Sequence, residues 1–184
     1  AGLGPADVVK RVDTLLDQMG TDEVATMVYV VADPGRGRLV VANAGHPPPI
    51  IIEPNGAARQ VDIAHGRLLG VRPPLPRRHE DVTQISSGGH FLLYTDGLIE
   101  PLERAGQDGI AHLCRVAEGF AGTAQELCDH VIGELAPEGT SDDICVLAAT
   151  LTAQPHQRRR GRRRPRQLPV RAINPDSLSR SERR

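Results

Sequence analysis

The sequence predicts an α+β fold in a single domain over residues 1–153. Three observations support this prediction. Segments with the patterning of β-strands dominate residues 24–95, helical stripes are concentrated in residues 110–135, and the two do not alternate as βαβ units. A chain of 184 residues with 39% hydrophobic content is also long and apolar enough to bury one core of ordinary size.

The first predicted element is a helix. Gly4-Pro5-Ala6-Asp7 is typical of a helix start, because a proline in the first turn gives up no hydrogen bond there. Apolar residues then recur at helical spacing until Gly20, and they are Val8, Val12, Leu15, Leu16 and Met19. We expect the helix to pack through that single stripe.

Strands and turns follow the helix. Residues 24–32 are apolar on both faces, which predicts a central strand, and residues 38–43 return as its hairpin partner after a turn rich in Gly and Pro. The later expected segments are strands at 50–53 and 58–62 around the turn Pro54-Asn55-Gly56, a loop at 66–76, and a strand nearer an edge at 79–85.

A proline-rich corner lies between the two hairpins, at Gly45-His46-Pro47-Pro48-Pro49. Three prolines force an extended backbone, which predicts a rigid corner; a proline-rich ligand for a recognition domain is the alternative. His46 is either a structural histidine or, if the corner lies near carboxylates, a group that hydrogen-bonds a phosphate or a metal-bound water. The residues leave both interpretations open.

Helical patterning dominates the later part of the domain. Residues 103–108 are predicted to be a polar loop, and a helix is expected over 110–117. Thr123 and Glu126 have capping-box spacing, and the apolar stripe that follows consists of Leu127, Cys128, Val131, Ile132 and Leu135. Pro137 and Gly139 are expected to stop this helix.

The apolar run 91–95 ends abruptly at the dipeptide Asp96-Gly97. Both faces of the run are apolar, which predicts a strand in the interior of a sheet. Glycine lets the backbone turn with positive φ or approach an ion closely, so Asp96 is presented at the rim of the core. An Asp-Gly dipeptide is common in turns, and a ligand site needs a second acidic group at the same place.

That second group is offered by Asp142 and Asp143, which precede another run apolar on both faces, 144–151. If this strand pairs antiparallel with the run that ends at Asp96, the carboxylates meet at one end of the sheet. Converging carboxylates repel one another unless a cation lies between them, and all-oxygen ligands favour Mg²⁺ or Mn²⁺ over zinc. The residues therefore predict a hard-metal site.

Three motifs in this order resemble a known family. They are Ala42-Asn43-Ala44-Gly45-His46-Pro47-Pro48-Pro49, then Leu93-Tyr94-Thr95-Asp96-Gly97-Leu98-Ile99-Glu100, then Ser141-Asp142-Asp143-Ile144. Over residues 3–151 the chain resembles metal-dependent serine/threonine protein phosphatases of the PPM type, and most of all their bacterial SpoIIE/RsbU-like branch.

The resemblance implies a two-sheet β-sandwich flanked by helices and a site that holds two Mg²⁺ or Mn²⁺ ions. It implies that Asp96 and Asp142 are the catalytic metal ligands, with Asp143 as an auxiliary metal ligand. No organic cofactor is implied. The activity would be hydrolysis of phosphoserine or phosphothreonine on a regulatory protein of partner-switching signalling, with an anti-sigma-factor antagonist as the candidate substrate.

The sequence also departs from the family pattern. Family members carry an upstream Gly-Asp-Val-x-Gly-His-Gly-like segment, which supplies the aspartate that bridges both ions, and these 184 residues contain no such segment. We therefore expect a domain truncated at its N-terminus, with impaired activity. The segments Gly66-Arg67-Leu68-Leu69-Gly70 and Gly89-His90 differ more mildly from the family pattern, in loops.

Charge divides the chain at residue 154. Residues 1–153 hold 11 Arg and Lys against 21 Asp and Glu, a net charge of −10, whereas residues 154–184 hold 11 against 2, a net charge of +9. The second segment has no hydrophobic period, so we expect a disordered Arg-rich tail. Such a tail can bind nucleic acid through phosphates without sequence choice, and it has no aromatic residue to stack on bases.

Cysteine usage and apolar runs suggest a compartment. The three cysteines, Cys114, Cys128 and Cys145, are an odd number without Cys-x-x-Cys spacing, so we expect buried, reduced thiols. No apolar run reaches the ~18 residues of a membrane span, and no signal peptide is recognisable. These features predict a cytoplasmic protein that does not contact a membrane.

Two other function classes compete with the phosphatase. One is a truncated phosphatase-like module that binds protein partners without turnover, and the other is a nucleic-acid-binding protein that acts through its Arg-rich tail. Acidic residues in any segment upstream of Ala1 would discriminate the first of these from an active phosphatase.

Overall fold

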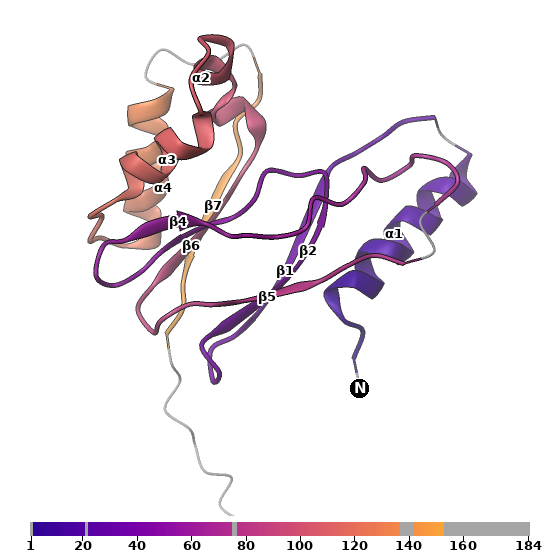
Figure 1. The fold of residues 1–184 in the computed structure, drawn as a ribbon, viewed down its shortest axis with the longest axis horizontal. Coiled ribbons are helices and arrows are strands. Elements are labelled where there is room, and N and C mark those ends of the chain that lie inside the picture. The colour runs from indigo at the N-terminus through magenta and orange to yellow at the C-terminus, as the bar shows by residue number, and fades with distance from the viewer. Residues whose placement is uncertain (1, 21, 75–76, 137–141, 153–184) are drawn as a thin grey trace, which may run out of the picture. The chain divides into compact units, whose positions relative to one another are not determined.

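Two antiparallel sheets form the framework of the protein in the computed structural model, which describes residues 2–20, 22–74, 77–136 and 142–152 (Figure 1). The first sheet has the order β1 (Met27–Asp33), β2 (Arg38–Ala44), β5 (Asp81–Gln84). The second has the order β4 (Ala58–Gln60), β3 (Ile50–Ile52), β6 (His90–Tyr94), β7 (Val146–Thr150). The predicted α+β sandwich is confirmed, and the Arg-rich tail lies outside the described residues.

The helices are α1 (Pro5–Met19), α2 (Glu100–Arg104), α3 (Gly109–Ala117) and α4 (Ala124–Leu135), with a short 3₁₀ turn at Asp96–Leu98. The predicted capping box opens α4, because Thr123 and Glu126 exchange hydrogen bonds as that motif requires. The predicted helix stops, Pro137 and Gly139, lie outside the described residues. No helix in the described ranges is long and apolar enough to cross a membrane.

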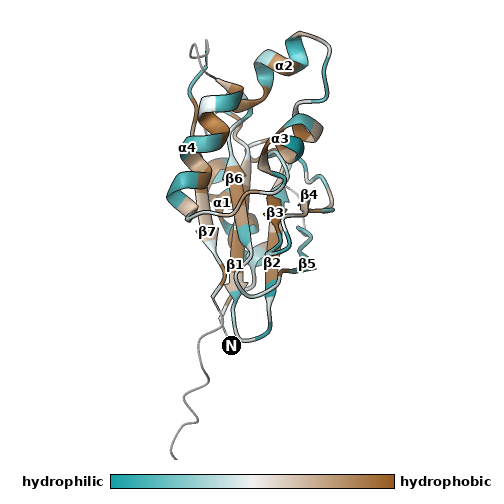
Figure 2. Cartoon of the chain, turned by 90° about the vertical axis from the view of Figure 1, so that its left-hand side faces the viewer, coloured by the Kyte–Doolittle hydropathy of each residue, from teal (hydrophilic) through white to brown (hydrophobic). Residues whose placement is uncertain are grey.

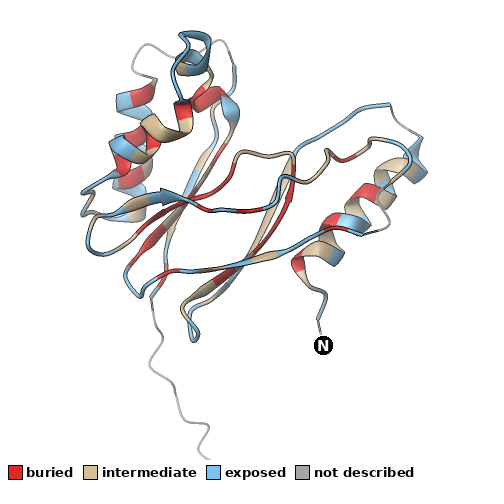
Figure 3. Ribbon diagram, in the orientation of Figure 1, coloured by how far each residue is buried: buried red, intermediate tan, exposed pale blue. Residues whose placement is uncertain are grey.

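A dry layer of aliphatic side chains joins the two sheets. Leu39 and Val41 of β2 face Ile51 of β3, and all three are buried. Further residues of this cluster are Val61, Ile63, Ile85 and Leu151. Hydrophobic colour runs along β1, β2, β3 and β6 in Figure 2, and of these strands β2, β3 and β6 carry buried residues in Figure 3. This layer is therefore built mainly from aliphatic residues, as expected for a chain with only 2% aromatic residues.

Helices α3 and α4 cover the outer face of the second sheet (Figure 1). Leu113 of α3 and Leu127 of α4 are fully buried in one cluster with Leu92 of β6. Helix α4 and strand β7 are in direct contact. This packing fixes β6 and β7 from the side away from the first sheet.

Helix α1 packs on the outer face of the first sheet, but its buried stripe differs from the predicted one. Val9 is fully buried, and Val12 and Leu16 pack in the same cluster, whereas Leu15 and Met19 are 56% and 75% exposed. The centre of the buried stripe holds a charged residue, Asp13. A pattern of apolar residues does not include a buried aspartate, so the predicted buried stripe of α1 differs from the observed one.

Three smaller expectations were wrong. Strand β1, predicted to be central, lies at the edge of the described sheet; it is apolar on both faces because α1 covers one face and the second sheet covers the other. Part of the predicted loop 103–108 belongs to α2, which starts with a proline in its first turn and carries an ion pair between Glu100 and Arg104. None of the three cysteines is buried as expected, since Cys145 is exposed and Cys114 and Cys128 are partly exposed, although all three thiols are free.

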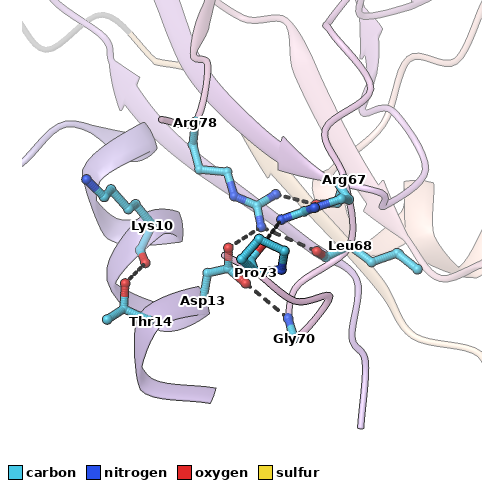
Figure 4. Close-up of polar contacts among 8 residues, drawn as sticks. All are labelled: Lys10, Asp13, Thr14, Arg67, Leu68, Gly70, Pro73 and Arg78. Carbon is cyan, nitrogen blue, oxygen red and sulfur yellow. Dashed lines mark hydrogen bonds and ion pairs between the residues drawn. The ribbon is translucent and has the colours of Figure 1, made fainter. Parts of the chain in front are cut away.

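A buried ion pair fastens α1 to the loop before β5 (Figure 4). The guanidinium of Arg78 donates to Asp13 Oδ2 at 2.6 Å, and each of these side chains is 1% exposed. Arg78 also donates to the carbonyls of Arg67 and Leu68, while Gly70 N–H donates to Asp13 Oδ1 at 3.0 Å. Of the Arg78 guanidinium nitrogens, only Nε lacks a hydrogen-bond partner among the described residues. Removing Asp13 or Arg78 would leave the charge of the other buried without its counter-charge.

We therefore expect Asp13→Ala to lower the free energy of unfolding by about 3–5 kcal/mol in urea titrations, because Arg78 would remain buried without its carboxylate. Asp17→Ala is the matched control on the same helix, since Asp17 pairs with Arg72 at 3.3 Å on the surface. That variant should cost less than about 1 kcal/mol. Equal losses in the two variants would show that burial of the pair is unimportant.

Tyr94 places a hydroxyl in the cluster beneath α3 and α4. The residue is 2% exposed, and among the described residues its hydroxyl has no hydrogen-bond partner. Burial, followed by the charge of Cys114, raises the pKa of Tyr94. The neutral phenol is thus favoured in the folded state, so its contribution to stability is complete below the ordinary pKa of 10.0 and is lost as the pH rises above it.

Tyr94→Phe should keep the free energy of unfolding within about 1 kcal/mol of the original chain near neutral pH, because it removes an unpartnered hydroxyl. The variant should also lose less stability than the original chain when urea unfolding is repeated at about pH 11. A loss of more than about 2 kcal/mol near neutral pH would reveal a partner for the hydroxyl.

Candidate metal centre

Strands β6 and β7 bring the predicted acidic residues to one end of the second sheet. The two strands pair antiparallel from His90 opposite Thr150 to Tyr94 opposite Val146. The end of β6 therefore lies beside the start of β7, as the two apolar runs predicted. Asp96 follows β6 by two residues, and the dipeptide Asp142-Asp143 precedes β7 by three.

Thr95 continues the pairing past the ends of both strands. Its N–H donates to the carbonyl of Cys145 at 3.0 Å, and its hydroxyl oxygen accepts from Cys145 N–H at 2.9 Å. The same hydroxyl donates to the carbonyl of Asp143 at 3.1 Å. The backbone immediately before Asp96 is thus tied to the backbone of Asp143.

Gly97 then lets the two segments touch. A methyl group on Gly97 would come within 2.6 Å of the Asp143 carbonyl oxygen and 3.5 Å of the Asp142 carbonyl carbon. Gly97 is not among the glycines with positive φ. Of the two reasons that the sequence offered for this glycine, close approach is therefore the one that applies.

The three carboxylates are exposed and lie at the rim of the sheet. Asp96 Oδ1 accepts from Gly97 N–H at 3.2 Å, and Asp142 Oδ1 accepts from Asp143 N–H at 2.8 Å, so local bonds orient both side chains. Oxygen-only donors suit Mg²⁺ or Mn²⁺ in kind. The number of ligands is too small, however, because the described part of the chain contains no group of three or more His, Cys, Asp or Glu placed to hold a metal ion.

The proline corner also reaches this rim. Asn43, which is 6% exposed, donates to the carbonyl of His46 and accepts from its N–H, each at 2.8 Å. The His46 ring makes a hydrogen bond with Thr26 Oγ1 through Nδ1 at 3.0 Å. These bonds fasten the corner to the end of β2 and to the segment just before β1.

Burial lowers the pKa of His46, and two weaker effects oppose it: the hydrogen bond to the Tyr94 backbone and the negative charge of Asp96. The influence of Asp96 shows that the imidazole lies within electrostatic range of the predicted metal ligand. Of the two interpretations left open by the sequence, the nearby charge of Asp96 fits the functional one, and the hydrogen bond to Thr26 fits the structural one.

Sequence reasoning missed two residues of this region. Thr95 stands directly before the Asp-Gly dipeptide, so its position at the end of the predicted strand was clear from the sequence. A strand pattern does not reveal, however, that its hydroxyl bonds to the segment before β7. Thr26 lies at the start of an apolar run and carries no motif. Both contacts join segments at least 20 residues apart, which only the tertiary fold can bring together.

Comparisons with known proteins agree with this architecture. A family model described as Stage II sporulation protein E (SpoIIE) matches residues 1–152. Phosphoserine phosphatase RsbP of Bacillus subtilis (strain 168) is 35% identical over 111 residues, which cover 54% of this chain and 26% of RsbP. The chain thus spans about a quarter of the length of that curated relative.

Solved structures match as well. The crystal structure of the RsbU and RsbW domains of Rv1364c from Mycobacterium tuberculosis is similar with a TM-score of 0.68 at 26% identity, over 84% of this chain and 44% of that one. The phosphatase domain of SpoIIE from Bacillus subtilis, presoaked with Mn, gives a TM-score of 0.62 at 17% identity, over 94% of this chain and 74% of that one. The second likeness shows the fold alone.

Proposed function

The chain belongs to the SpoIIE family of protein serine/threonine phosphatases, and from this premise we propose that residues 1–152 are part of a metal-dependent phosphatase domain. The proposed reaction is hydrolysis of phosphoserine or phosphothreonine on a protein. The observation that carries the proposal is the convergence of Asp96 and the Asp142-Asp143 dipeptide at one end of the paired strands β6 and β7. Residues 154–184 are proposed to be a separate Arg-rich segment.

In the proposed site Asp96 and Asp142 hold Mg²⁺ or Mn²⁺, and Asp143 is an auxiliary ligand. When bound, such ions polarise phosphoryl oxygens and lower the pKa of a coordinated water. The contribution of the chain itself is geometric: Thr95 and Gly97 keep the two acidic segments in contact, and the local N–H donors orient the carboxylates. Because the carboxylates are exposed at the rim, a phosphorylated side chain of a partner protein has access to them.

The substrate that we propose is a phosphorylated regulatory protein of partner-switching signalling, with an anti-sigma-factor antagonist as the candidate. RsbP is named a phosphoserine phosphatase, and the matched Rv1364c structure holds an RsbU domain together with an RsbW domain. These relatives support the class of substrate, and the exposed rim suits a protein substrate better than a small buried one.

We further propose that these 184 residues hold metal weakly on their own. Two divalent ions carry four positive charges, whereas Asp96, Asp142 and Asp143 supply at most three negative ones. The family resemblance places the bridging aspartate in an upstream segment. Asp22 and Glu23 precede β1, where a surface loop between helix and strand explains them more simply.

The test is Mn²⁺-dependent hydrolysis of para-nitrophenyl phosphate by this chain, by a version extended upstream with a family-type Gly-Asp segment, and by Asp96→Asn variants of both. The extended version should be active, and its activity should disappear with Asp96→Asn or after chelation of the metal, because an essential ligand or ion is then missing. The 184-residue chain alone should show little turnover.

The outcomes separate the competing functions. Robust turnover by the 184 residues alone, abolished by Asp96→Asn, would refute the weak-metal proposal but keep the phosphatase. No Mn²⁺-dependent turnover by any version would contradict the phosphatase proposal and leave the alternative of a non-catalytic module that binds protein partners. Removing residues 155–184 from every version tests whether the tail contributes.

A further inference from the structure

A pocket of about 310 Å³ lies between α1 and the segment before β5, and its lining residues are Ala6, Asp7, Lys10, Arg77 and Arg78. We propose that this pocket binds the phosphate group of a phosphomonoester, held by Lys10, Arg77 and the Nε–H of Arg78. The lining contains none of the acidic residues at the end of β6 and β7, so this site and the proposed metal centre can be tested independently.

Positive charge is concentrated on the two segments that form the pocket. Residues 5–19 and 67–78 hold six Lys and Arg against three Asp and no Glu, a net charge of +3, whereas residues 1–153 together carry −10. Clefts lined by one sign of charge focus the electric field and raise the local concentration of counter-ions. The pocket is therefore a place where this acidic domain attracts anions.

The two exposed cations of the pocket are available to a ligand. Among the described residues, neither the Lys10 ammonium nor the Arg77 guanidinium makes an ion pair or a hydrogen bond. Arg72, which lies on the same loop as Arg77, does pair, with Asp17 at 3.3 Å. An anion in the pocket would therefore gain two cations without breaking an existing ion pair.

Arg78 adds a donor that is buried. Its side chain is 1% exposed, and its two terminal nitrogens donate to Asp13 and to the carbonyls of Arg67 and Leu68 (Figure 4). Its Nε is buried and has no hydrogen-bond partner among the described residues. A buried donor without an acceptor costs free energy, and an anion in the pocket that Arg78 lines would supply the missing acceptor.

The donors and the size of the pocket indicate the class of ligand. Three side chains offer donors, and a phosphate monoester has three strong acceptor oxygens, whereas a carboxylate has two. Small-molecule pockets range from about 300 to 1,000 Å³, so this pocket has room for the atoms esterified to the phosphate as well as for the phosphate itself. A small phosphomonoester and a phosphorylated side chain of a protein share this chemistry.

One carboxylate of the lining opposes an anion, and it gives the test a change of opposite sign. Asp7 lines the pocket, where its negative charge repels a phosphate. A second carboxylate, that of Glu80, accepts from the Ala6 N–H at 3.1 Å, so this donor of α1 is already occupied. The lining still holds two unpaired cations against one carboxylate.

The experiment titrates the full 184-residue chain with O-phosphoserine and follows backbone amides and arginine Nε–H groups by NMR. A chelator excludes binding through metal, and the site-resolved signals separate the pocket from the Arg-rich residues 154–184. The Nε–H of Arg78 should shift and saturate. Lys10→Ala and Arg77→Ala should each weaken binding about fivefold or more, because a charge-assisted hydrogen bond is lost. Asp7→Asn should strengthen binding, because a repelling charge is removed.

Arg11→Ala is the matched control. It removes the same charge from the same helix, but Arg11 lines the neighbouring hollow and not this pocket. At physiological ionic strength it should change the affinity less than about twofold, because exposed charges outside the site are screened. If Arg11→Ala weakens binding as much as Lys10→Ala does, the binding reflects net charge and the proposed site is wrong. A failure of Asp7→Asn to strengthen binding would also contradict the site.

Three further ligands define the chemistry and its source. Acetate should not saturate the Arg78 signal, and inorganic phosphate should bind more weakly than O-phosphoserine; equal binding of either would refute the phosphomonoester. A phosphoserine peptide that binds at least as tightly as O-phosphoserine supports a protein source. A peptide that leaves the Arg78 signal unchanged supports a small phosphomonoester. No saturable shift of Arg78 with O-phosphoserine would overturn the proposal.

Discussion

The hydroxyl of Thr95 is the contact on which the acidic end of the protein depends. It accepts from Cys145 and donates to Asp143, so the antiparallel pairing of β6 and β7 continues after both strands have ended. Charged segments at the end of a sheet would otherwise separate, because their carboxylates repel. The neutral side chain of Thr95 keeps the two acidic segments together. Gly97 contributes because it has no side chain that would push them apart.

The rest of the fold supports this end from two directions. Helices α3 and α4 press on the outer face of the second sheet, while the loop that Arg78 and Asp13 fasten to α1 passes beneath the proline corner. A methyl group on Gly66 in that loop would lie 2.0 Å from the carbonyl oxygen of Asn43. The loop must therefore stay free of side chains there, and the corner rests directly on its backbone.

Local patterns predicted the elements well, and tertiary contacts explain the misses. The apolar runs before Asp96 and after Asp143 predicted two paired strands, and the capping box at Thr123 predicted the start of α4; both were found. The burial of Asp13 was not predicted, because a charged residue within an apolar helical stripe interrupts the hydrophobic pattern. The contacts of Thr95 and His46 lie in no local pattern, since their partners come from distant segments.

Diffraction from crystals of this chain soaked in Mn²⁺ tests the central claim most directly, because anomalous scattering locates the ion without any assay of activity. The account predicts a manganese peak at the end of β6 and β7, with carboxylate oxygens of Asp96 and Asp142 about 2.0–2.6 Å away. A well-occupied peak elsewhere, with none at Asp96, would contradict it.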